Sequence, residues 1–178
     1  DLQNFLDTMF QPLWNQAKEW SEQRWPSGNI TSDLSNAMQI LSPSDFGFHN
    51  ALLKDNKLFF LDFEYFGRDD SVKLMADFVW HPGMNLSNSQ KSIWLKGAFE
   101  IFKKDLNIHV RFHAAWPIFG LRWALILLNE FLEGGWQKRV YANIDLKNQK
   151  ESKLKNQLNK AKDICRKIQL ENMECPYV

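Results

Sequence analysis

The sequence has little net charge and few cysteines. It contains 22 Lys and Arg against 21 Asp and Glu, which gives a formal net charge of +1 at pH 7. This balance provides no global field to attract nucleic acid or an anionic membrane, so we expect neither as a partner. Cys165 and Cys175 are the two cysteines, and no metal-type spacing surrounds them. We expect reduced thiols in a cytoplasmic protein, although a bridge between the two stays open.

The sequence also lacks a long apolar run. Its most apolar stretch, Ala114 to Leu128, contains Pro117 and Arg122 and falls short of the roughly 20 apolar residues that a membrane-spanning helix requires. We therefore interpret it as a core helix. The polar start, Asp1 to Asn4, shows no basic segment of a secretory signal, which also favours a cytoplasmic location.

Aromatic residues and helical periodicity predict a mainly α fold. The 178 residues include 8 Trp and 14 Phe, enough for one well-packed domain over residues 1–178. Apolar spacing and capping residues predict helices over the following ranges: 1–20, 33–40 with Asp33 as N-cap, 71–80, 89–104, 113–133 and 145–171. Residues 63–70 show no period and are predicted to form a loop. The many basic residues of the last helix are interpreted as a solvated face rather than a surface for nucleic acid or lipid.

The stretch over residues 41–62, LSPSDFGFHNALLKDNKLFFLD, interrupts the helical pattern. Two apolar runs, 51–53 and 58–61, flank the turn-like residues 54–57, which predicts a β-hairpin. The fold class expected is thus α+β, mainly α with one small hairpin. Asn50 would lie at the entrance of the hairpin and Asp62 at its exit.

Asp45, Asn50 and Asp62 have a spacing suited to phosphoryl transfer. Each alone is weak evidence, because Asp and Asn are common in turns and caps. Together they reproduce the order D-x-x-x-x-N followed by D-F that kinase-like enzymes use. There one Asp orients the proton of an attacking hydroxyl, while Asn and the second Asp hold Mg²⁺ on the nucleotide phosphates.

Residues 42–52 (SPSDFGFHNAL) and 61–67 (LDFEYFG), with Asp77 further on, resemble the aminoglycoside phosphotransferase and choline kinase family, whose fold is protein-kinase-like. The resemblance loosely covers most of the chain, and its specific motifs lie in residues 42–77. It implies a helical C-terminal lobe with Asp45 as catalytic base and Asn50 and Asp62 as Mg²⁺ ligands. It also implies that Asp77 is a buried carboxylate that supports the catalytic loop, and that ATP is the phosphoryl donor.

The chain departs from the family pattern at two points. Pro43 stands where the family usually has His, so the catalytic loop must be supported differently. In addition, no G-x-G-x-x-G and no strand-borne Val-Ala-x-Lys precede Asp45. We therefore expect the chain to be the C-terminal lobe alone, which turns over poorly without an N-terminal lobe of the same protein that covers the nucleotide.

Two further residues are candidate contacts. His49 adjoins Asn50 and either approaches phosphate or substrate or is a packed loop histidine. Glu64 is either a substrate contact or an ion-pair partner. The hypothesis is an ATP- and Mg²⁺-dependent phosphotransferase acting on a small-molecule hydroxyl, with aminoglycoside, sugar and amino alcohol all open as acceptors. The alternative is a catalytically degenerate kinase-like binding module. A protein kinase is disfavoured because His-Arg-Asp and Ala-Pro-Glu are missing.

Overall fold

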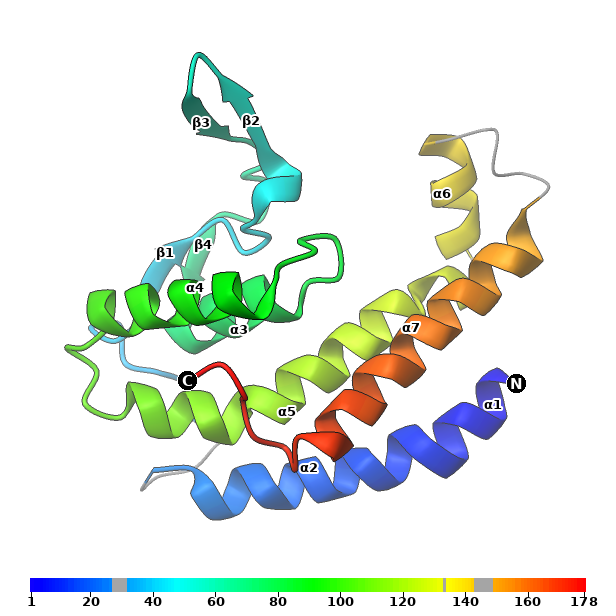
Figure 1. Ribbon diagram of the computed structural model, residues 1–178, viewed down its shortest axis with the longest axis horizontal. Coiled ribbons are helices and arrows are strands. Elements are labelled where there is room, and N and C mark those ends of the chain that lie inside the picture. Colours follow the sequence, from blue (N-terminus) through cyan, green and yellow to red (C-terminus); the bar gives the residue numbers. More distant parts are fainter. Residues whose placement is uncertain (27–31, 133, 143–148) are drawn as a thin grey trace.

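The computed structural model describes residues 1–26, 32–132, 134–142 and 149–178. Within these ranges the chain is mainly helical and carries two small antiparallel sheets, which confirms the α+β class (Figure 1). The helices are α1 (Leu2–Phe5), η1 (Leu6–Phe10), α2 (Gln11–Arg24), η2 (Phe48–Asn50), α3 (Ser71–Trp80), α4 (Asn88–Ile101), α5 (Ile108–Leu127), η3 (Asn129–Phe131), α6 (Gly135–Ala142) and α7 (Lys150–Leu170). The strands are β1 (Ile40–Ser42), β2 (Ala51–Lys54), β3 (Lys57–Phe60) and β4 (Gly67–Asp69).

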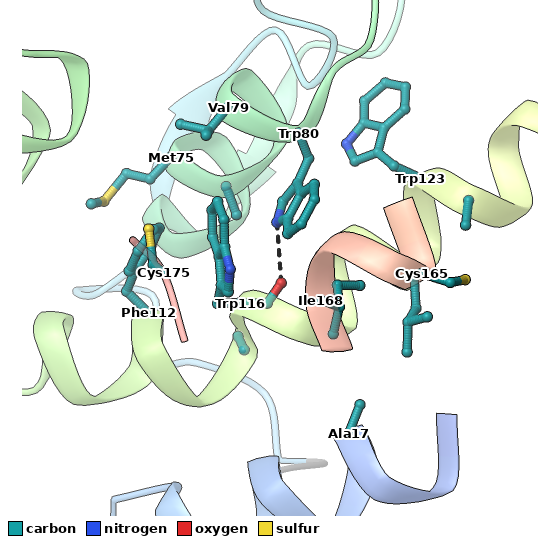
Figure 2. Close-up of a cluster of buried hydrophobic side chains, with 14 of the residues drawn as sticks. Ala17, Met75, Val79, Trp80, Phe112, Trp116, Trp123, Cys165, Ile168 and Cys175 are labelled. Atoms are coloured by element: carbon teal, nitrogen blue, oxygen red, sulfur yellow. Dashed lines mark hydrogen bonds between the residues drawn. The ribbon is translucent and has the colours of Figure 1, made fainter. Parts of the chain in front are cut away.

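Helix α5 lies at the centre of the helical core. It packs against α2, α3 and α7, which come from distant parts of the sequence (Figure 1). The side chain of Trp116 on α5 is fully buried, and its backbone carbonyl accepts a hydrogen bond from Trp80 Nε1 at 3.2 Å (Figure 2). Ile168 and Cys165 of α7 lie in the same apolar cluster. Proline and arginine are thus accommodated in a core helix, as predicted for residues 114–128.

The amphipathic helices at the two ends of the chain are confirmed. The first helical segment runs from α1 through η1 into α2, and it buries Phe5, Leu13 and Ala17. Helix α7 buries the predicted apolar stripe at Leu158, Ala161, Cys165 and Ile168. Residues 145–148 of the helix predicted over 145–171 lie outside the described residues.

Helix α3 begins and ends where the sequence predicts. Asp70 is its N-cap and accepts a hydrogen bond from the backbone N–H of Val72 at 2.9 Å. His81 follows its last residue. Helix α4 begins with a capping box formed by Ser87 and Gln90. No helix among the described residues is long and apolar enough to cross a membrane.

The predicted helix over residues 33–40 is wrong. The predicted loop over 63–70 is confirmed at residues 63–66, but Gly67–Asp69 form strand β4. Ile40 begins strand β1, which pairs antiparallel with β4, so that Ile40 lies opposite Asp69. The turn before β1 is closed by a hydrogen bond from Met38 N to Ser35 O at 2.9 Å. Pairing between segments far apart in sequence overrides the weak local propensity of both.

The predicted hairpin is confirmed as β2 and β3. Ala51 pairs with Phe60 and Lys54 with Lys57. Asp55 and Asn56 form the two-residue turn with φ angles of +50° and +60°, the left-handed conformation that Asp and Asn tolerate and that suits tight hairpins. The hairpin extends away from the helices in Figure 1, and its apolar side chains are exposed, Leu53 to 70%.

Candidate functional site

The loop between β1 and η2 carries Asp45. Ser44 has a left-handed φ of +66° and donates its backbone N–H to Ser42 Oγ at 3.0 Å. Asp45 N donates to Pro43 O at 2.8 Å. At Gly47 a Cβ would lie 2.6 Å from the His49 ring and 2.7 Å from Met84 Sδ, so a side chain would not fit without displacing its neighbours. These local contacts fold the backbone of the loop that carries Asp45.

Three of the predicted site residues meet at this loop. Asn50 Nδ2 donates to the backbone carbonyl of Asp45 at 3.0 Å and lies 3.3 Å from its Oδ2. His49 Nε2 lies 3.1 Å from Asp45 Oδ1. The Asp45 side chain keeps 48% exposure, so its remaining lone pairs can accept from a small molecule in solvent.

Asp62 lies at the exit of the hairpin, as predicted. Leu61 N donates to Asn50 O at 2.8 Å, which brings the two ends of the hairpin side by side. Asp62 then adopts a left-handed φ of +61°, a conformation that is uncommon outside Gly, Asn and Asp. The backbone segments that carry Asn50 and Asp62 therefore lie side by side.

Tyr65 lies close to the acidic residues of this site and was not predicted as part of it. Its phenol is hydrogen-bonded to Glu64, and this bond together with the Glu64 charge raises the pKa of Tyr65. The negative charges of Asp62 and Asp45 add smaller contributions in the same direction. Glu64 is exposed and acts on the phenol of the neighbouring Tyr65.

Asp77 is buried on α3 and contacts α5. Its Oδ1 and Oδ2 accept from Arg122 Nη1 at 2.6 and 2.8 Å, and Oδ1 also accepts from Trp123 Nε1 at 2.9 Å. Lys73 Nζ lies 3.5 Å from Asp77 Oδ2 and donates to Ser44 Oγ at 2.9 Å. Asp77 therefore reaches the Asp45 loop through Lys73.

His81 lies under His49 at the end of α3. The two imidazole rings are stacked, with centroids 4.0 Å apart and planes at 4°. The His81 ring also contacts the Trp123 ring, with centroids 4.5 Å apart and planes at 76°. Burial lowers the pKa of His81, and the charge of His49 lowers it further.

A cavity of about 450 Å³ opens beside Asp45. Its walls come from the loop, from α3 and from α5, and it lies between the carboxylate and the helical body. The lining residues are Ser44, Asp45, Tyr65, Asp77, His81, Arg122, Trp123 and Ile126.

Asp45, His49 and His81 offer metal-ligand atoms within 4.8 Å of one another, but their geometry disfavours a shared ion. Gly83 N donates to His81 Nδ1 at 3.0 Å, so the ring proton lies on Nε2 and occupies the lone pair that a metal would need. In addition, an imidazole binds metal in its own ring plane, and two parallel stacked rings share no such point. Asn50 and Asp62 both carry the oxygen type that Mg²⁺ prefers, and the Asn50 Oδ1 stays available while Nδ2 donates to Asp45.

The structure thus places His49 and Asn50 in contact with Asp45. Asp62 lies at the adjoining hairpin exit, and Glu64 lies beside Tyr65. Asp77 lines the cavity from α3. Sequence reasoning missed Lys73, His81 and Arg122 as neighbours of the site. His81 directly follows the predicted helix over residues 71–80. A polar residue directly after this helix was the only sequence signal that could have indicated a place for His81 near the site.

No family model matches the chain, and neither does any curated protein or solved structure. The family resemblance therefore depends on the residues over 42–77 and on their arrangement.

Proposed function

We propose that this chain is the kinase-like C-terminal lobe of an ATP- and Mg²⁺-dependent phosphotransferase that acts on a hydroxyl of a small molecule. One observation carries the proposal. Asn50 donates to Asp45 across the five-residue spacing while the hairpin returns Asp62 to the same end. A base and two oxygen ligands on one rigid loop and strand pair are the parts that phosphoryl transfer needs.

Each residue has a distinct role in this proposal. Asp45 orients the acceptor hydroxyl and takes its proton as the oxygen attacks. Asn50 and Asp62 would hold Mg²⁺, which offsets the charge of the ATP phosphates when bound. Asp77 keeps α3 in position against α5, and Lys73 transmits that position to the Asp45 loop.

The acceptor belongs in the cavity beside Asp45. Its volume of about 450 Å³ falls in the range of small-molecule sites. Tyr65, Ile126 and Trp123 supply apolar surface there, and Arg122 supplies a charged edge. Aminoglycosides, sugars and amino alcohols all remain candidate acceptors.

The hairpin supports a second part of the proposal, an N-terminal lobe of the same protein that covers the nucleotide. Leu52, Leu53, Leu58 and Phe59 are each at least half exposed on β2 and β3. Leu52 pairs with Phe59 and Leu53 with Leu58, so both faces of the hairpin carry exposed apolar side chains. Exposed apolar surface of this kind marks a place where another protein layer packs. A cytoplasmic location, where ATP is abundant, belongs to the same proposal.

The test uses two substitutions in the full-length protein, with Mg-ATP turnover and ATP binding as readouts. Asp45→Asn is expected to lower kcat by about 10²- to 10⁴-fold and to leave ATP binding intact. Asp62→Ala is expected to lose Mg²⁺-dependent ATP binding. Asp163→Asn is the matched control, because that carboxylate is 68% exposed on α7 and pairs with Arg166. Unchanged turnover in Asp45→Asn would refute the proposal.

Pro43 favours one alternative, a degenerate kinase-like module that binds a ligand without phosphoryl transfer. It replaces the residue that usually supports the catalytic loop in the resembled family. A rise in melting temperature with Mg-ATP, without any phosphorylated product, would select the alternative. Product formation that depends on Asp45 would exclude it.

A further inference from the structure

We propose that His49, held in place by His81, is the positioning residue for Asp45 and takes the supporting role left open at Pro43. This inference rests on the proposed phosphotransferase function. It gives His49 a role other than the phosphate or substrate contact considered from the sequence, and it gives His81 a role for the first time. The pair acts through Asp45: His49 is not among the residues that line the cavity, whereas His81 lines it beneath the proposed acceptor site.

The contact between His49 and Asp45 has a defined direction. A carboxylate oxygen only accepts, so the 3.1 Å contact to Asp45 Oδ1 requires the proton on His49 Nε2. Asn50 lies against the other carboxylate oxygen at 3.3 Å. With one donor on each oxygen, rotation of the Asp45 carboxylate about its terminal torsion is restrained. A lone pair of each oxygen remains for the acceptor hydroxyl.

His81 fixes the ring that makes this contact. Its own orientation is set on one edge by the Gly83 N–H at 3.0 Å and on one side by Trp123. The flat stack at 4.0 Å and 4° then holds the His49 ring parallel to it. Gly47 leaves room for the His49 ring, because a Cβ there would lie 2.6 Å from it. The His49 ring therefore stacks on His81 and lies close to the loop backbone at Gly47.

Positioning of this kind matters for catalysis because proton transfer requires close approach in the correct direction. A displacement of a catalytic group by about 1 Å can cost about 100-fold in rate. The Asp45 side chain is half exposed, so the loop alone restrains it little. His49 supplies the missing restraint on Asp45, and His81 in turn holds His49. Because His81 directly follows α3, the helical core sets its position.

The experiment measures hydrolysis of Mg-ATP by the full-length protein, with water as the acceptor. His49→Ala should lower kcat by about 10- to 100-fold and change the KM for Mg-ATP by less than about twofold. His49→Gln, whose amide Nε2 can donate to the same oxygen, should restore most of the loss. His81→Ala should resemble His49→Ala, whereas His81→Phe keeps a flat ring for stacking and should retain more activity. The matched control is His109→Ala, since His109 stacks on Phe99 at 3.9 Å away from the cavity and its loss should leave kcat unchanged.

A second measurement does not depend on activity. In ¹⁵N spectra of residues 1–178, His49 and His81 should each carry a proton on Nε2, and Asp45→Asn should shift the His49 nitrogen signals. A His49 Nε2 without a proton would overturn the proposal. So would unchanged kcat in His49→Ala when Asp45→Asn is inactive, and that result would leave the phosphotransferase function standing. Full activity in Asp45→Asn would instead overturn the function and the positioning role together.

Discussion

Lys73 Nζ lies 2.9 Å from Ser44 Oγ, and this contact joins helix α3 to the loop that holds Asp45. The same ammonium also lies 2.7 Å from Asp69 Oδ2 and 3.5 Å from Asp77 Oδ2. Only 20% of the Lys73 side chain is exposed. A single cation therefore connects β4, α3 and the candidate catalytic loop.

Lys73→Met should destabilise the protein and loosen the loop. We expect the free energy of unfolding to fall by about 1–3 kcal/mol, because a partly buried charged donor with several partners is lost. The backbone N–H of Asp45, which donates to Pro43 O, should exchange faster with solvent. Urea unfolding and hydrogen exchange measure the two effects.

Lys103→Met is the control for this prediction. Lys103 pairs with Glu100 at 3.3 Å, and both side chains are 73% exposed, so its removal should change stability by less than about 0.5 kcal/mol. Equal effects of the two substitutions would show that Lys73 is an ordinary surface lysine.

The hairpin and the α3 cap could be predicted because both depend on residues adjacent in sequence. Asp55 and Asn56 form the turn through their own backbone preferences, and Asp70 caps α3 two residues from its partner Val72. The β1 and β4 pairing could not be predicted in this way, since Ile40 and Asp69 meet only after the chain has folded back. Short strands of three residues also carry almost no periodic signal.

The same distinction between local contacts and contacts of distant segments applies to the candidate site. The spacing of Asp45 and Asn50 predicts a contact within one loop, and the structure contains it. The place of His81 under His49 depends instead on packing of the loop against α3, where Phe46 and Phe78 stack at 5.9 Å. Tertiary contacts of this kind bring the end of α3 to the loop, so local sequence gave no indication of the His49–His81 stack.

Asp77→Ala should be more destabilising than Arg122→Met. Asp77 is buried and accepts from both Arg122 and Trp123, so its loss leaves a buried indole N–H without its partner and should cost about 2–4 kcal/mol. Arg122 keeps 43% exposure, and water can replace part of its contact, so its removal should cost about 1 kcal/mol.

A double-mutant cycle on these two residues measures their coupling by urea unfolding. The coupling should be clearly favourable, because the two Asp77 oxygens share one guanidinium nitrogen. Additive effects would mean that Asp77 is stabilised by Trp123 and Lys73 instead.

Both cysteines should be unreactive in the native protein. Burial raises the pKa of Cys165 and of Cys175 from 9.0 to about 12, and only the thiolate attacks a thiol reagent. At pH 8 we expect negligible labelling until a denaturant exposes both thiols, which would then react together.

The same pKa shifts predict how stability depends on pH. The unfolded chain releases these thiol protons near pH 9, whereas the folded chain retains them up to about pH 12. The unfolded state then binds fewer protons, so stability present below pH 9 should be lost as the pH rises from 9 toward 12. Replacing both cysteines by Ala should flatten this part of the pH profile, and an unchanged slope would assign it to other groups.

Gly120 and Gly97 should respond in opposite directions to substitution by Ala. In α5, a Cβ on Gly120 would lie 2.8 Å from Trp80 Cζ2 and 2.9 Å from Ile168 Cδ1, atoms of large side chains within the core. Overpacking of this kind costs about 1–3 kcal/mol. In α4, a Cβ on Gly97 would meet no atom within 4 Å, and Ala is favoured over Gly in a helix by about 1 kcal/mol. In urea unfolding, the free energy of unfolding should therefore be lower for Gly120→Ala and higher for Gly97→Ala than for the unsubstituted protein. A stabilising Gly120→Ala would mean that Trp80 and Ile168 can move apart, and the close packing of α3 and α7 against α5 would then be looser than these contacts indicate.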